Sequence, residues 1–374
     1  MSRPILVAIF AVMICPALRA QHMTVDQLRG MLAAQKSARK SDGDVAGKVA
    51  AVDLTEQLTP PALDKIEADF QLGPKTVEAL ALQADISGFL DPPPGELPTK
   101  DPPDAATREQ MLRRAIEFAA ITMHRMPDFL ATRTTRGFDD RPLQVSLSGW
   151  YPAQRNLHLA GTFAEQITYR DGKEVFDEPP SQQNSKATVQ PSPSGLTTSG
   201  EFGPVLATVI TDALKGQMTW SHWEQTSAGV AAVFHFQIPQ DASHYSVSFC
   251  WVVGPSLSSY RHINDMADAK FNCYKGTPAY HGSITIDPAT GIVLRIAIES
   301  DLPPKDRLAR ADLFVQYGSV EIGGRIYTCP MRSVAVSLIR FPESTPARTL
   351  LCLNEATFAN YHRFGASIRV LPAH

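Results

Sequence analysis

Residues 21–90 carry apolar positions at helical spacing, interrupted by helix-breaking residues. Thr24 and Gln27 have the spacing of a capping box, and apolar residues follow them on one helical face. Thr59 before Pro60 predicts the start of another helix, since proline is tolerated at the first helical position. The pattern predicts a small, all-helical N-terminal domain over residues 21–90.

Residues 91–104 are rich in proline, which denies the backbone both helical geometry and hydrogen-bond donors. We expect this segment to be a linker. Over residues 105–130 apolar side chains again recur at helical spacing, so one long helix is predicted to follow.

From Leu143 the apolar period changes from 3.6 to two, which indicates strands. Asp171-Gly172 lies between two such runs and is a strong hairpin signal. Residues 179–200 are Pro, Ser, Gln and Thr-rich and are predicted to form a mobile loop, and one helix is expected over 202–215. The fold class is therefore predicted as α+β, with residues 131–374 forming an antiparallel sheet that the 202–215 helix covers on its apolar face.

The first twenty residues have the pattern of a secretory signal peptide. Arg3 precedes an apolar run from Ile5 to Cys15, and Ala20 offers a small residue for cleavage. The run is shorter than the roughly 20 apolar residues that span a bilayer. We therefore expect residues 1–20 to be removed and the protein to be periplasmic or extracellular.

Four cysteines remain after that signal: Cys250, Cys273, Cys329 and Cys352. An even number in a secreted protein suggests two disulfides, with three possible connectivities. Cys250–Cys273 and Cys329–Cys352 are preferred because each pair closes a short loop with 22 intervening residues. The alternative is four buried thiols.

The net charge argues against nucleic acid as a partner. Without residues 1–20 the chain has 33 basic and 38 acidic residues, a net charge of −5. Such a chain lacks the basic stripe that nucleic acid requires. It also lacks a polybasic segment for anionic lipid, although contact with a membrane stays open.

No motif points to a cofactor or to catalysis. Residues 254–258 come nearest to a nucleophile elbow, but a serine replaces the second glycine. Trp220, His222 and Glu224 share one strand face, and with His235 they could contribute to a zinc site, although a half-exposed polar face explains them as well. Arg133 and Arg136 could together bind an anionic group, or simply solvate the connection between domains.

A resemblance rests on three strand-turn-strand pieces, at residues 167–174, 280–298 and 320–327. Together they resemble the periplasmic lipoprotein carriers LolA and LolB, and the whole layout resembles an uncharacterised family of secreted proteins from Gram-negative soil bacteria. The resemblance implies a strongly curved antiparallel half-barrel whose concave apolar surface holds an acyl chain. This chain departs from a simple carrier in its helical domain and its four cysteines.

The sequence thus predicts a non-enzymatic protein that binds a lipid or acyl chain within the curved sheet. The alternative is an envelope protein-interaction module that recognises a protein partner through its helical front and has no small-molecule ligand. Ordinary core packing is the competing explanation for the expected lining residues. These are Leu206, Ile210, Val230, Phe234, Phe236, Tyr245, Val247, Phe249 and Trp251.

Overall fold

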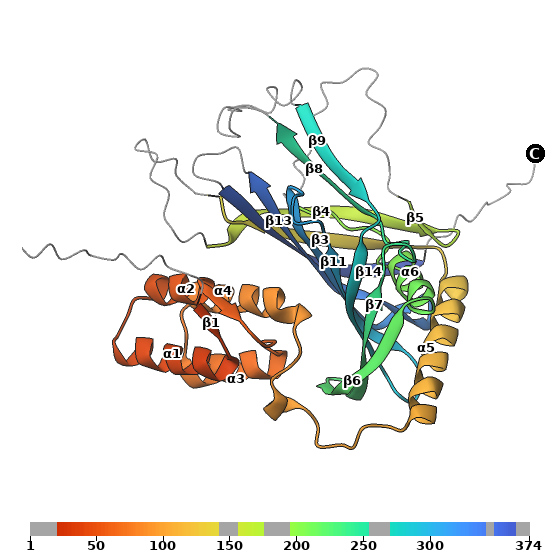
Figure 1. Ribbon diagram of the computed structural model, residues 1–374, viewed down its shortest axis with the longest axis horizontal. Coiled ribbons are helices and arrows are strands. Elements are labelled where there is room, and N and C mark those ends of the chain that lie inside the picture. The colour runs from red at the N-terminus through yellow and green to blue at the C-terminus, as the bar shows by residue number, and fades with distance from the viewer. Residues whose placement is uncertain (1–20, 142–155, 176–194, 254–269, 342–347, 364–374) are drawn as a thin grey trace, which may run out of the picture.

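The computed structural model describes residues 21–141, 156–175, 195–253, 270–341 and 348–363. The predicted signal peptide, the 254–258 motif and most of the predicted 179–200 loop lie outside these ranges. Figure 1 shows a helical region beside a large sheet. The protein is α+β, as predicted, with an N-terminal helical region followed by an antiparallel sheet of ten strands within the described ranges.

The helical region and the segment after it contain two short strands, four α-helices and two short 3-10 helices before a long helix. Their bounds are β1 Gln21–Met23, α1 Val25–Ser37, α2 Asp42–Ala50, β2 Val52–Leu54, α3 Pro60–Phe70, α4 Pro74–Ile86, η1 Ser87–Phe89, η2 Pro94–Glu96 and α5 Ala105–Arg125.

The helix starts follow the local signals. Thr24 caps α1 in a complete capping box with Gln27, and Thr59 caps α3, whose first residue is Pro60. The region is not all-helical, because β1 and β2 pair in parallel. The long helix α5 ends at Arg125 and not near 130, since Pro127 disfavours helical geometry in the residue before it.

The sheet contains most of the remaining elements. Their bounds are β3 Phe129–Asp139, β4 His158–Arg170, β5 Lys173–Val175, α6 Pro204–Ala213, β6 Gln217–Thr226, β7 Gly229–Ile238, β8 Val247–Val253, β9 Lys270–Gly276, β10 Ala279–Ile286, β11 Val293–Asp301, β12 Leu308–Ile322, β13 Arg325–Phe341 and β14 Arg348–Arg363. The strand order is β5-β4-β3-β14-β13-β12-β11-β10-β7-β6. Among the described strands, β8 pairs with β9 alone, in a separate two-stranded sheet.

The predicted half-barrel is wrong. The sheet is neither closed nor strongly curled, and β5 and β6 lie at its two open ends. Both of its faces are covered: α5 and α6 lie on one face, and the helical region lies against the other (Figure 1). A sheet layered between helices buries apolar surface on each side, so it does not need to curl around a ligand.

The predicted hairpins are present. Asp171 and Gly172 join β4 to β5 with φ of 53° and 77°, the left-handed geometry that this turn type requires. β10 and β11 form the hairpin predicted over 280–298, and Gly323-Gly324 joins β12 to β13. The turn between β12 and β13 thus joins two long strands in the interior of the sheet.

One predicted disulfide is wrong: Cys329 and Cys352 are free and buried. Cys352 pairs with Ser337 of β13, eight residues along that strand from Cys329. At about 3.4 Å per residue the two backbones are about 27 Å apart, far beyond disulfide reach. Cys250 and Cys273 face each other across β8 and β9. Because the side chain of Cys250 lies outside the described residues, that pairing stays a prediction.

We predict that the protein secreted from an oxidising host has two free thiols per chain. Denaturing alkylation without reductant, followed by mass spectrometry, should label Cys329 and Cys352 only. Burial raises the pKa of both thiols to about 12, so labelling should be slow before denaturation. Recovery of a peptide that joins Cys329 to Cys352 would contradict the register of β13 and β14.

Candidate functional site

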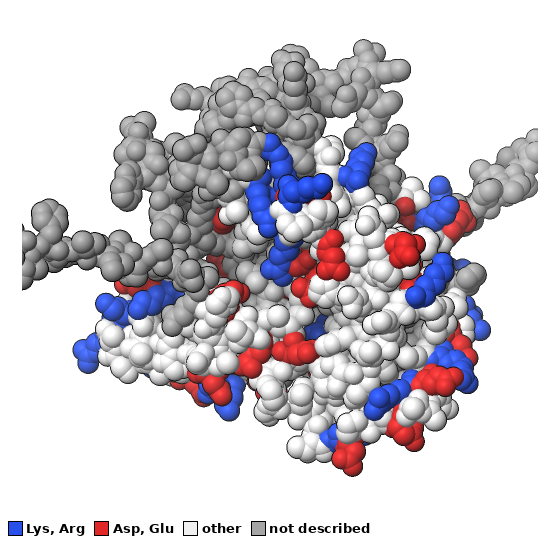
Figure 2. All heavy atoms as spheres, viewed as in Figure 1, with Lys and Arg blue, Asp and Glu red and all other residues white. Residues whose placement is uncertain are grey.

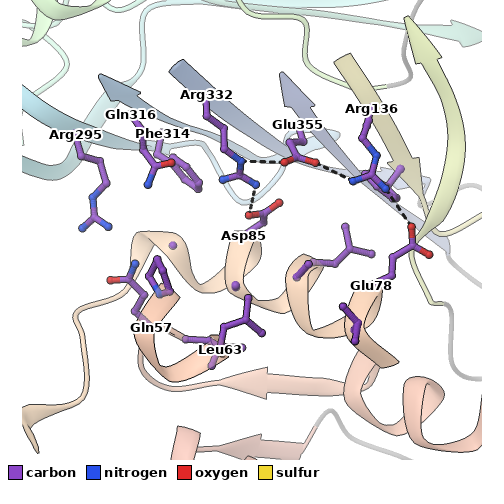
Figure 3. Close-up of a pocket in the computed structure, with 18 of the residues that line it drawn as sticks. Gln57, Leu63, Glu78, Asp85, Arg136, Arg295, Phe314, Gln316, Arg332 and Glu355 are labelled. Atoms are coloured by element: carbon purple, nitrogen blue, oxygen red, sulfur yellow. Dashed lines mark hydrogen bonds and ion pairs between the residues drawn. The ribbon is translucent and has the colours of Figure 1, made fainter. Parts of the chain in front are cut away.

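A cavity of about 610 Å³ lies between the helical region and the sheet face that it covers. Side chains from α3, α4 and η1 form one wall, and strands β3 and β11 to β14 form the other (Figure 3). Its lining residues are Gln57, Leu58, Pro60, Leu63, Pro74, Val77, Glu78, Ala81, Leu82, Ala84, Asp85, Gly88, Arg136, Phe138, Arg295, Phe314, Gln316, Arg332 and Glu355. The set combines an apolar helical wall with a sheet wall that carries three arginines.

Apolar burial anchors this cavity to the rest of the fold. Leu82 packs in one cluster with Phe138 and Phe314 of the sheet. Phe89 of η1 meets the ring of Phe314 edge-on, with centroids 5.5 Å apart. These contacts fix the helical wall at one distance from the strands.

A chain of charges crosses the cavity and has both ends on α4. Asp85 is 2.5 Å from Arg332, which also donates to Glu355 at 2.9 Å. Arg136 then bridges Glu355 and Glu78, at 3.2 Å each. Asp85 and Glu78 are seven residues apart, about two helical turns, so both carboxylates face the sheet (Figure 3).

Burial dominates the electrostatics at one end of this chain. It raises the pKa of Asp85 to about 6, although the Arg332 guanidinium opposes the shift. The side chain of Asp85 is 9% exposed, whereas that of Glu78 is 48% exposed. The ion pair at the Asp85 end is therefore the one shielded from salt and water.

The other end of the cavity has polar atoms without hydrogen-bond partners in the part of the chain that the structure describes. Arg295 is 9% exposed, its Nε has no partner, and its nearest carboxylate oxygen is that of Glu224 at 3.5 Å. The Oε1 of buried Gln57, which lines the cavity, and the Oγ1 of Thr285, beside Arg295 on the neighbouring strand, also lack such partners. Thr285 pairs in register with Arg295, and Arg295 with Gln316, so these residues form one row across the sheet.

Two histidines lie beyond this row toward the sheet edge: His222 continues it through Val233, and His235 lies in the neighbouring row opposite Ser283. His235 lies 3.0 Å from Asp91. This hydrogen bond holds the pKa of the Asp91 carboxyl below its ordinary value and raises the pKa of His235. Burial lowers the pKa of His222, whose Nε2 has no partner. Glu224 contacts Arg295 rather than either histidine. Among the described residues no group of three or more His, Cys, Asp or Glu could hold a metal ion.

The predicted lining residues do not line this cavity. Leu206, Ile210, Phe234 and Phe236 are buried in one core cluster, on the face that α5 and α6 cover, and Tyr245 packs against them. Val247 and Phe249 belong to another buried cluster.

Two further lining predictions do not fall in that core. Val230 is 36% exposed, and the side chain of Trp251 lies outside the described residues.

The cavity is on the face of the sheet opposite the core that α5 and α6 cover, because side chains alternate along strands. Leu313 and Val315 face that core, and Phe314 and Gln316 face the cavity.

Arg133 and Arg136 are separated as well. They are three residues apart on β3, so they point to opposite faces. Arg136 lines the cavity, whereas Arg133 is buried and donates to Glu165 at 2.7 Å and to the carbonyl of Thr198 at 2.7 Å. The predicted joint anion site does not form.

Sequence reasoning missed the residues that do meet in the cavity. The residues come from three elements: Asp85 from α4, Arg332 from β13 and Glu355 from β14. More than 200 residues of chain separate α4 from β13. One local signal was present: a charged or polar residue at a strand position that should face a core, as at Arg295, Gln316 and Arg332.

We predict that Asp85→Asn abolishes one component of the pH dependence of stability. The folded chain binds the Asp85 proton more tightly than the unfolded chain, because the folded pKa is about 6 against an ordinary 3.8. This contribution is fully present below about pH 3.8 and is lost as the pH rises through about 6. Urea unfolding at several pH values should therefore show the wild type losing stability relative to Asp85→Asn over this range.

The matched control is Asp64→Asn, at an exposed position of α3. Its stability should run parallel to that of the wild type. Parallel curves for Asp85→Asn and the wild type would contradict the shifted carboxyl.

Compared with models of known protein families, with curated proteins and with solved structures, the chain matches none. In the described part of the chain no helix has both the length and the apolar character needed to cross a bilayer. The geometry of the cavity is therefore the basis for any functional conclusion.

Proposed function

We propose that this protein is a non-enzymatic, secreted or periplasmic binding protein that holds a lipid or acyl chain between its helical region and its sheet. The apolar cavity of about 610 Å³ on the helical side of the sheet is the observation that supports this proposal. Ligand pockets in proteins commonly have volumes of about 300–1,000 Å³ and mostly apolar walls.

The lining favours an extended apolar ligand. Leu58, Leu63, Val77 and Ala81 offer aliphatic surface, and Phe138 faces them from β3. Removing a methylene group from water into such surroundings contributes about 0.8 kcal/mol. A chain of several methylenes would therefore gain enough free energy to stay bound without any covalent link.

Binding is favoured over catalysis by the state of the charged groups. Arg332, Glu355 and Arg136 are held in ion pairs with one another and with α4. Side chains tied in this way support the wall of a site. A general acid or base needs a free path to a substrate proton.

A second candidate function is an envelope protein-interaction module without a small-molecule ligand. Exposed apolar side chains favour it: on β13, Ile326 is 75% exposed and Met331 is 43% exposed. In that case, protein secreted from an oxidising host would have no extractable lipid.

We predict that filling the cavity removes the ligand. Ala81 is an exposed residue of α4 that lines the cavity, so Ala81→Trp should occupy it with little disturbance of the core. Native mass spectrometry of residues 21–374 secreted from an oxidising host, followed by organic extraction, should find lipid on the wild type and at least tenfold less on Ala81→Trp.

Ala34→Trp is the matched control, on the exposed side of α1 and away from the cavity. It should retain as much lipid as the wild type, and the melting temperatures of both variants should be close. Equal lipid on Ala81→Trp and Ala34→Trp would place the ligand elsewhere. A wild type without extractable lipid would favour the interaction module.

A further inference from the structure

We propose that the ligand of this cavity has an uncharged, hydrogen-bonding head group on a single apolar chain, and that Arg295 and Gln57 bind that head group. This inference rests on the proposed function and names its ligand class. Ligands of this class are long-chain alcohols, amides and monoacylglycerols. Free fatty acids and phospholipids, whose head groups are charged, would bind less tightly.

Unpaired polar atoms locate the head group. Nε of Arg295 and Oε1 of Gln57 have no hydrogen-bond partner among the described residues, and both atoms are shielded from bulk water. Leaving such buried groups unpaired is unfavourable, so a partner held in the cavity would stabilise them. A guanidinium supplies donors only, whereas a side-chain amide can present either its oxygen or its nitrogen. A hydroxyl or amide head group can satisfy both residues.

The position of these residues gives the ligand a direction. Figure 3 shows Arg295 and Gln57 at one end of the cavity and Arg136 and Glu78 at the other. Aliphatic side chains of α3 and α4, such as Leu63 and Val77, lie along the helical wall. A single chain with its head at Arg295 would therefore extend along the apolar helical wall.

The charge balance argues against an anionic head group. The cavity lining has three arginines and three carboxylates. Arg332 and Arg136 are already paired with those carboxylates, and the carboxylate of Glu224 is 3.5 Å from Arg295. An added anion would have no cation of its own and would be repelled by these carboxylates.

Charged side chains of both signs are visible on the outer face. Figure 2 shows basic side chains gathered in its upper middle, with acidic side chains beside and below them. The neutral head group is therefore inferred from the cavity lining and not from the charges of this face.

Three probes of the same chain length test the head group: monolauroylglycerol, laurate and the methyl ester of lauric acid. Isothermal titration to delipidated protein at about pH 8, where laurate is ionised, should give monolauroylglycerol at least tenfold tighter binding than laurate. The ester, which accepts but does not donate, should fall between them.

The outcomes separate this inference from the proposed function. Equal affinities for the three probes, or tighter binding of laurate, would overturn the neutral head group and leave lipid binding in place. No binding of any probe, by a protein that also carries no extractable lipid, would overturn both.

Variants test the two residues. Gln57→Leu should weaken the binding of monolauroylglycerol at least fivefold and leave the affinity for the methyl ester within twofold of the wild-type value. It should not lower the melting temperature, because it removes an unpaired buried oxygen. The double variant Glu224→Gln, Arg295→Gln removes both charges together. It should weaken the binding of monolauroylglycerol by a similar factor. Gln110→Leu, on the exposed side of α5, is the control and should change neither affinity. Unchanged monolauroylglycerol affinity in both cavity variants would contradict the assignment.

Discussion

Apolar contacts around Phe314 hold the helical region on the sheet, and the chain of charges from Glu78 through Arg136, Glu355 and Arg332 to Asp85 fixes the orientation of α4 there. Both ends of the chain are on α4, so the helix cannot rotate about its axis without breaking one of them. The Asp85 end is the buried one, so the loss of Arg332 would leave a buried carboxylate unpaired. The same ion pairs join the two walls of the cavity.

Helices cover both faces of the sheet, and how closely they pack on each face determines where a ligand can bind. On the α5 and α6 side, aromatic and aliphatic residues such as Phe234 and Ile296 interdigitate in one core. On the other side, charged residues share the face with Phe138 and Phe314, so the helical region packs over it without filling it. The linker reaches the opposite face by passing the β6 edge, where Trp223 donates to the carbonyl of Asp101 at 2.9 Å.

Local signals predicted local structure well, since capping and turn chemistry act over a few residues. The capping box at Thr24 and the turn at Asp171-Gly172 are examples. Strand β3 was not recognised, because its inward positions include Arg133 and Thr135, which no apolar alternation reveals. The Cys329–Cys352 pairing failed because it depended on the register between β13 and β14, which loop length does not determine. The half-barrel failed because nothing in the alternation of a strand tells how far a sheet curls.

The predicted lining residues lie on the face opposite the cavity for a related reason: the aromatic strand pattern predicts burial equally well for a packed core and for a binding surface. Photocrosslinking with a long-chain alcohol that carries a diazirine on its chain, followed by peptide mapping, decides between the two faces most directly. The account predicts labelling of α3, α4 and the cavity-facing positions of β12 and β13, such as Phe314. Labelling confined to α6 and β7, at residues such as Leu206 and Phe234, would contradict it.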